Sequence, residues 1–290
     1  MFQKILVATD LSEASDHVIG CLHGLKPLGA EEALLVHALG IRYLEDMKDM
    51  LAPMVEPRLQ AQKALLEAQG FVSRYAIMPG LPGVEVNRAA SHEHASMIVI
   101  GTRGATLARE VLLGGSALEV LHQARVPVLV MPVSIVEGAG ATRCEVACSE
   151  FTKQVLYPTD FSDTAERAFT YVERFVESGT RRVTLLHVQD QVHIGKHLKD
   201  RLEEFNRIDW SRLERLRGDL EHKGATNVRI EIPFGSPIQE IVRRAKDADD
   251  TVIVMGSQGR GFISEVFLGS VSHQVVRQAP VPVLLIPALR

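Results

Sequence analysis

The chain has 290 residues, a length that suits about two domains, and 46% of its residues are hydrophobic and 23% charged. With a formal net charge of −4 it offers no global positive field, so nucleic acid is not an expected partner. No apolar run approaches the roughly 20 residues of a membrane span, and the amino terminus is typical of a strand rather than a signal peptide. We therefore expect no membrane association and a cytoplasmic location.

The first half alternates short apolar runs with longer stretches of helical character. This pattern predicts an α/β fold, with a parallel sheet and helices on both of its faces. Ser12 suits a helix N-cap and Gly70 a helix stop, while Pro53 and Pro57 should kink or split the second helix. The predicted strands are 2–9, 32–38, 71–78, 96–100 and 126–132.

Residues 134–152 carry small and polar residues without a clear period, which predicts a linker. The linker contains Cys144 and Cys148, and the only other cysteine is Cys21. Three cysteines do not make a disulfide framework. We favour two ordinary linker thiols at Cys144 and Cys148 over a redox pair or a metal clip.

The second half repeats the alternation, with Ser162 as an expected N-cap and Gly224 as an expected helix stop. The charged stretch 202–224 predicts a solvated amphipathic helix with Trp210 and the leucines facing inward. The predicted strands are 153–159, 182–188, 226–232, 250–255 and 281–287.

A glycine-rich segment occurs twice, as GTRGATLAREVLLGGS from residue 101 and as GSQGRGFISEVFLGS from residue 256. The likeness extends to the first, second and last strands of each half, so duplication is the simplest explanation. We therefore predict one domain over 1–133, the linker over 134–152 and a second domain over 153–290. The final strands 126–132 and 281–287 each carry a proline typical of a sheet edge, and we expect pairing there between the halves or between two chains.

Each glycine segment follows an apolar strand and precedes a helix, where backbone N–H groups and the helix dipole favour a phosphate. Ligands of open parallel sheets bind beyond the carboxyl ends of the strands, where strand order reverses. If the first and fourth strands flank that point, Asp160 meets Gly256 in the second half and Asp10 meets Gly101 in the first. The two crevices then suit an adenosine phosphate.

Other nucleotide motifs fit less well. A GxGxxG turn after the first strand and a GxxxxGK[ST] loop are both absent from the sequence. No general base is evident, and no metal site is expected, because the two histidines of SHEHAS lack a third ligand. Binding is therefore favoured over catalysis.

The spacing GxxG, nine residues, then G[ST], after a strand that ends in Pro-Thr-Asp, resembles the universal stress protein family, as a tandem two-domain member spanning essentially the whole chain. The resemblance implies two open five-stranded parallel sheets of order 3-2-1-4-5. It also implies ATP or AMP binding in many members and none in others, with dimerisation through the last strand. Mg²⁺ could accompany ATP.

The resemblance also implies the binding residues. In the second half the contacts to adenosine and phosphate fall on Pro158, Thr159, Asp160, Val188, Met255, Gly256, Gln258, Gly259, Gly269, Ser270, Val271 and Ser272. In the first half the corresponding positions are Ala8, Thr9, Asp10, Ala38, Gly101, Arg103, Gly104, Gly114, Gly115 and Ser116. Ala8 replaces a proline, and Gly115 replaces the hydroxyl residue Ser270. The second crevice is therefore expected to bind better.

Three functions stay open at this point. The chain is a stress-response protein that binds an adenine nucleotide and acts as a regulatory or interaction module; or a slow Mg²⁺-dependent ATPase or adenylyl transferase; or a nucleotide-free interaction scaffold. The purely structural alternatives are a turn or N-cap role for Asp10 and Asp160 and tight strand-to-helix packing for the glycines.

Overall fold

The computed structural model divides into two compact units, Met1–Ser149 (unit 1) and Glu150–Arg290 (unit 2), which are described separately. It describes residues 1–40, 45–102, 113–138, 141–146, 150–190, 202–247, 252–259 and 268–288. Among these residues, no helix combines the length and the apolar character needed to cross a bilayer.

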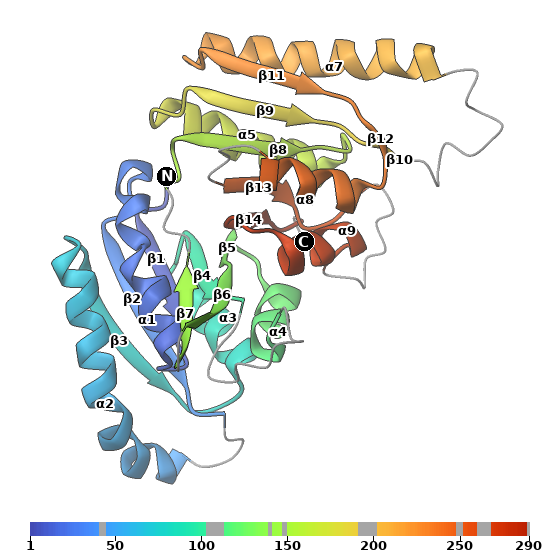
Figure 1. Cartoon of the computed structure of the whole chain (residues 1–290). Helices are drawn as coiled ribbons and strands as arrows, with labels where there is room; N and C mark the ends of the chain where they lie inside the picture. Colours follow the sequence, from blue (N-terminus) through green and yellow to red (C-terminus); the bar gives the residue numbers. More distant parts are fainter. Residues whose placement is uncertain are drawn as a thin grey trace. The chain divides into compact units, whose positions relative to one another are not determined.

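The sheet of unit 1 has the strand order β3-β2-β1-β4-β5, and all neighbouring strands are parallel (Figure 1). Its strands are β1 (Lys4–Ala8), β2 (Glu32–Ala38), β3 (Val72–Met78), β4 (Met97–Gly101) and β5 (Val128–Met131). Each lies within two residues of its predicted bounds. The central strands β1 and β4 are buried apolar runs, as a sheet covered on both faces requires.

Unit 2 repeats this arrangement in the order β11-β9-β8-β13-β14, again with parallel neighbours. Its strands are β8 (Gln154–Pro158), β9 (Arg182–Leu186), β11 (Asn227–Glu231), β13 (Val252–Gly256) and β14 (Val283–Ile286). A two-residue parallel pair, β10 (Gln189–Asp190) and β12 (Phe234–Gly235), extends beyond β9 and β11. The predicted order 3-2-1-4-5 is therefore confirmed in each unit. The assembly role of β5 and β14, the last strands of these orders, stays a prediction.

Helices pack in pairs within each unit. In unit 1, α1 contacts α2 and α3 contacts α4; in unit 2, α5 contacts α7 and α8 contacts α9 (Figure 1). The helices of unit 1 are α1 (Glu13–Gly20), the 3-10 helix η1 (Leu22–Leu28), α2 (Glu45–Ala68), α3 (Pro82–His92) and α4 (Gly115–Gln123). Those of unit 2 are α5 (Asp163–Glu177), α7 (Leu202–His222), α8 (Pro237–Asp247) and α9 (Ser270–Gln278).

Two predicted helix starts and two predicted helix ends are confirmed. Ser12 and Ser162 are the N-caps of α1 and α5, and each hydroxyl accepts a hydrogen bond from the backbone N–H three residues later. Gly70 and Gly224 have φ of 82° and 110° just after α2 and α7. Glycine adopts this left-handed conformation at little cost, so both helices end there.

Replacing Ser162 by alanine should destabilise unit 2 by about 1 kcal/mol, because a backbone donor at the start of α5 loses its acceptor. Urea unfolding of the full chain measures this, and Ser12→Ala provides the matched change in unit 1. An unchanged unfolding midpoint in both variants would show that the two caps contribute nothing.

The two prolines of α2 do not split the helix. Pro53 and Pro57 both lie inside one continuous helix, Glu45–Ala68, so of the predicted kink or split, the split is wrong. Leu59, Gln62 and Leu66 are fully buried along the carboxyl-terminal part of α2. This packing offsets the hydrogen bonds that the prolines remove.

Helix α7 buries leucines as predicted, but not Trp210. Leu213 and Leu220 are fully buried, but Trp210 is 47% exposed. Leucines seven residues apart define the inward stripe, and Trp210 lies at its margin. Asp209 takes the inward position beside the stripe, where its carboxylate contacts His187.

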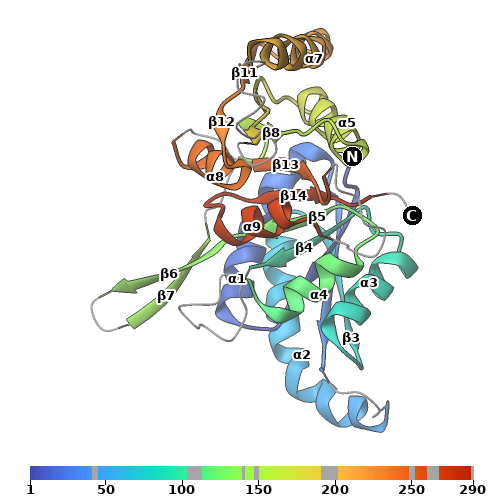
Figure 2. The same cartoon turned by 90° about the vertical axis from the view of Figure 1, so that its right-hand side faces the viewer.

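The segment predicted as a linker includes an antiparallel hairpin, β6 (Val133–Gly138) and β7 (Ala141–Val146), seen beside α1 in Figure 2. Strand β7 contacts α1. Cys21, almost fully buried at the end of α1, is disulfide-bonded, so at least one of the three cysteines that are not expected to make a disulfide framework takes part in a disulfide.

Three charged side chains meet at the amino ends of the unit 1 strands. Glu93 accepts from Lys4 Nζ at 3.1 Å and forms an ion pair with Arg74. The hydrogen bonds from Arg74 and then Lys4 lower the pKa of Glu93 from 4.5 to about 2.

Because the folded-state pKa of Glu93 lies below that of the unfolded chain, the ionised carboxylate stabilises the fold above about pH 4.5. This contribution should disappear as the pH falls from about 4.5 to about 2. The difference in unfolding free energy between the wild type and Glu93→Gln should shrink over the same interval. A difference that stays constant with pH would contradict the ion-pair assignment.

Candidate functional site

The candidate site of unit 2 lies at the carboxyl ends of two neighbouring parallel strands. Thr159 and Asp160 follow β8, and Gln258 and Gly259 follow β13. A Cβ atom on Gly259 would lie 2.6 Å from Asp160 Oδ2, so the carboxylate and the glycine turn are in direct contact. The structure thus brings together the two motifs that the sequence placed in one crevice.

Asp160 also organises its own turn. Its Oδ1 atom accepts from Ser162 N at 3.1 Å and from Ser162 Oγ at 2.6 Å. Ser162 in turn caps α5. The turn role and the ligand role of Asp160 are therefore compatible, because Oδ1 serves the turn while Oδ2 lies against Gly259.

The glycine turn is closely packed on the first turn of α5. A Cβ atom on Gly256 would lie 2.9 Å from Thr164 Oγ1, and Thr164 Oγ1 donates to the carbonyl of Gln258. Gly256 ends β13, directly after the buried Met255. Close packing explains why position 256 requires glycine, whether or not a ligand binds at the turn.

Helix α9 begins directly after Gly269, its N-cap, which makes no side-chain capping bond. The first-turn N–H groups of Ser270, Val271 and Ser272 have no acceptor within the helix, and such groups bind anions. The Ser272 hydroxyl is buried and donates to Gly256 O at 3.0 Å, so it serves packing. The Ser270 hydroxyl is exposed and makes no hydrogen bond to the described residues.

On the side of the crevice away from the glycine turn, His187 and Val188 follow β9. Thr159 O accepts from His187 Nδ1 at 2.7 Å, and His187 Nε2 lies 3.4 Å from Asp209 Oδ2. The Phe161 ring lies 4.7 Å from the His187 ring, and the Arg212 guanidinium lies 5.0 Å from the Phe161 ring. An aromatic ring, a half-buried Val188 and a nearby cation suit a flat heterocycle.

Phe161, Asp209 and Arg212 were missed by sequence reasoning. Phe161 directly follows Asp160 and has a φ of 59°, which is unusual for a bulky residue. Its position beside the aspartate was a usable signal. The two α7 residues approach the crevice only through the packing of that helix, and no local motif identifies them.

Unit 1 has the same framework with different details. Asp10 Oδ1 accepts from Ser12 Oγ at 2.6 Å and from Ser15 Oγ at 2.7 Å. Thr9 Oγ1 donates to Gln62 Oε1 at 2.8 Å. Ala8 ends β1 and Ala38 ends β2, beside this turn.

At the phosphate end of unit 1, Gly101 ends β4 and Gly114 caps α4, with Gly114 N donating to Thr102 O at 2.8 Å. Gly115 and Ser116 begin α4 and are exposed. The predicted contacts Arg103 and Gly104 lie outside the described residues.

Comparisons with known proteins agree with the duplicated fold. The model of the universal stress protein family matches residues 1–132 and 152–287. A universal stress protein of Methanocaldococcus jannaschii is 35% identical over 153 residues, covering 46% of this chain and 94% of that protein. One from Mycolicibacterium smegmatis is 28% identical over 232 residues, covering 78% of this chain and 74% of that protein. The crystal structure of a universal stress protein from Archaeoglobus fulgidus has a TM-score of 0.76 at 28% identity, covering 99% of this chain and 98% of that chain.

Proposed function

The chain belongs to the universal stress protein family, and from this premise we propose that it binds an adenine nucleotide, ATP or AMP, in the crevice of unit 2 and more weakly in that of unit 1. Nucleotide occupancy then regulates its interactions in a stress response. The observation that carries the proposal is the contact between the Asp160 carboxylate and Gly259, beside the first turn of α9.

The chemistry of the crevice supports this ligand class. Asp160 can accept hydrogen bonds from ribose hydroxyls, while first-turn N–H groups of α9 and the Ser270 hydroxyl can donate to phosphate oxygens. Phe161 and Val188 offer apolar surface to the base. Mg²⁺ can accompany ATP by binding to its phosphates.

Two measurements on the purified full chain test the proposal. Mass spectrometry of co-purifying small molecules should identify an adenine nucleotide, without a prior choice of ligand. Calorimetric titration with ATP and AMP, with and without Mg²⁺, should show saturable binding that Asp160→Asn weakens. Asp160→Asn removes the charge but retains the size of the side chain. Asp163→Asn makes the same change at an exposed position of α5 and is the matched control. Absence of binding to both nucleotides would refute the proposal.

A further inference from the structure

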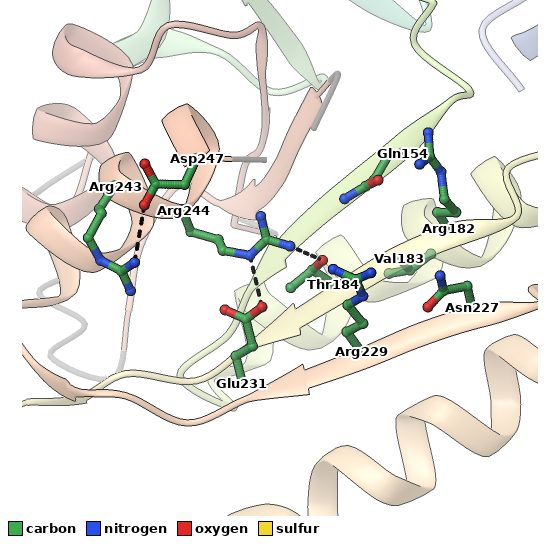
Figure 3. A pocket seen from close by; sticks show the side chains of 10 residues that line it. All are labelled: Gln154, Arg182, Val183, Thr184, Asn227, Arg229, Glu231, Arg243, Arg244 and Asp247. Carbon is green, nitrogen blue, oxygen red and sulfur yellow. Dashed lines mark hydrogen bonds and ion pairs between the residues drawn. The ribbon is translucent and has the colours of Figure 1, made fainter. Parts of the chain in front are cut away.

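A polar cavity of about 380 Å³ lies on the face of the unit 2 sheet that carries α8 (Figure 3). Its lining includes Gln154, Arg182, Asn227 and Arg229 from three adjacent strands, with Arg244 from α8. The volume is within the range of about 300–1,000 Å³ typical of small-molecule sites. The cavity is therefore large enough for a small metabolite.

The cavity is separate from the nucleotide crevice. Gln154, Arg182 and Asn227 are the first residues of β8, β9 and β11, and they lie side by side in the strand register. The nucleotide crevice lies beyond the carboxyl ends of the same parallel strands. Apart from Glu231, the last residue of β11, the strand residues of the lining lie among the first three residues of their strands, toward the opposite end of the sheet from Asp160.

Its side chains share one face of the sheet because residues two apart on a strand point to the same side. Thr184, two residues after Arg182, accepts from Arg244 at 3.0 Å, which places this face toward α8. In Figure 3, Arg182 and Arg229 rise from neighbouring strands on this side.

Some of the positive charge is neutralised within the cavity wall. Arg244 is buried and donates to Glu231 at 2.9 Å, and Arg243 forms an ion pair with Asp247 at 3.2 Å. Within the described part of the chain, however, the side chains of Arg182 and Arg229 have no hydrogen bond or ion pair. Two guanidinium groups on adjacent strands are therefore available to an anion.

Unit 1 has a different charge pattern at the same register positions. There Glu32 occupies the place of Arg182, and Arg74 occupies the place of Arg229. Arg74 is attracted by Glu32 and forms an ion pair with Glu93. The fold thus stays intact when this cluster is neutralised internally, so its uncompensated positive charge in unit 2 is not a requirement of the fold.

We propose that this cavity of unit 2 binds the phosphoryl group of a small phosphorylated metabolite, with Arg182 and Arg229 as the anchoring cations. Guanidinium groups recognise phosphate oxygens through paired, charge-assisted hydrogen bonds. Arginines on two adjacent strands can approach an oxyanion from two directions, and a tetrahedral phosphate presents more oxygens to them than a carboxylate does. The Asn227 and Gln154 amides contribute further polar groups, and the remaining volume accommodates the organic part of the ligand.

The test uses the full chain with inorganic phosphate, glycerol 3-phosphate and acetate as probes. Titration is followed through the arginine Nε–H resonances in ¹⁵N-labelled protein. The Arg182 and Arg229 signals should shift saturably, with glycerol 3-phosphate binding tighter than phosphate and acetate weakest. The double variant Arg182→Gln/Arg229→Gln should lose at least about tenfold in affinity for both phosphates.

Two further variants control for charge and folding. Arg207→Gln/Arg215→Gln changes the net charge equally on exposed positions of α7, and it should bind as the wild type does. Arg182→Glu reproduces the charge that unit 1 carries at this register position, so it should abolish binding while keeping the thermal unfolding midpoint. ATP affinity should stay unchanged in each variant, and Asp160→Asn should leave phosphate binding unchanged.

The outcomes separate this proposal from the nucleotide proposal. Equal phosphate affinity in Arg182→Glu and the wild type, or shifts confined to residues of the crevice, would overturn the phosphate site. Loss of ATP binding in Asp160→Asn with intact phosphate binding would support both sites as independent. Stronger binding of acetate than of phosphate would also overturn the assigned ligand class.

Discussion

Replacing Ser270 by alanine is expected to weaken binding of ATP or AMP to unit 2 by about ten- to a hundredfold. Ser270 is the first residue of α9, its hydroxyl is exposed, and it makes no hydrogen bond to the described residues. One hydrogen bond to a charged phosphate contributes about 1.5–3 kcal/mol, which corresponds to one to two decades of affinity. Alanine keeps the backbone N–H, so the loss measures the hydroxyl alone.

The control for Ser270→Ala is Ser211→Ala, which removes an exposed hydroxyl of α7 that donates to Arg207 O. It should leave nucleotide affinity within about twofold of the wild type. Calorimetry measures both variants, and circular dichroism checks that each is folded. Equal affinities in Ser270→Ala and the wild type would remove Ser270 from the site.

The reverse change, adding a hydroxyl at the corresponding position of unit 1, tests whether that hydroxyl increases nucleotide affinity. A Cβ atom on Gly115 would meet nothing within 4 Å, so Gly115→Ser should fit without strain. In a Ser270→Ala background, where the unit 2 site is weakened, Gly115→Ser should strengthen the remaining binding. No gain would mean that another part of unit 1, rather than the missing hydroxyl, limits its affinity.

Local sequence patterns identify the strands and helix ends because each depends on nearby residues. Short stretches rich in apolar residues that alternate with helical stretches predict the ten main strands within two residues. Serine caps and glycine stops mark α1, α2, α5 and α7. The meeting of Asp160 and Gly259 also follows from sequence, since parallel strands have their carboxyl ends at one edge.

Features that depend on helix packing escape such reasoning. Asp209 faces His187 only because Leu213 and Leu220 define the buried stripe of α7. The arginine cavity is equally hidden, because Arg182 and Arg229 are 47 positions apart in the sequence. They come to lie on adjacent strands, offset by two residues, only through the pairing of β9 with β11. The contact of α1 with β7 likewise joins distant segments.

Substituting alanine for Gly256 should destabilise unit 2 by about 1–3 kcal/mol, the usual cost of overpacking a core. The added Cβ would lie 2.9 Å from both the backbone carbon and Oγ1 of Thr164. Relief by movement is restricted, because β13 is buried along its length and Thr164 Oγ1 donates to Gln258 O. The strain should also displace the glycine turn and lower nucleotide affinity.

A double-mutant cycle with Thr164→Ala tests whether this contact is the cause. Thr164→Ala alone loses the hydrogen bond to Gln258, but in the Gly256→Ala background it also removes Oγ1 from the clash. The two changes should therefore cost less together than the sum of their separate effects. Gly115→Ala, whose Cβ enters open space, is the matched control and should leave the urea midpoint nearly unchanged. Strict additivity would show that the strain lies elsewhere. A measured coupling would mean that the first turn of α5 keeps position 256 a glycine even without bound nucleotide.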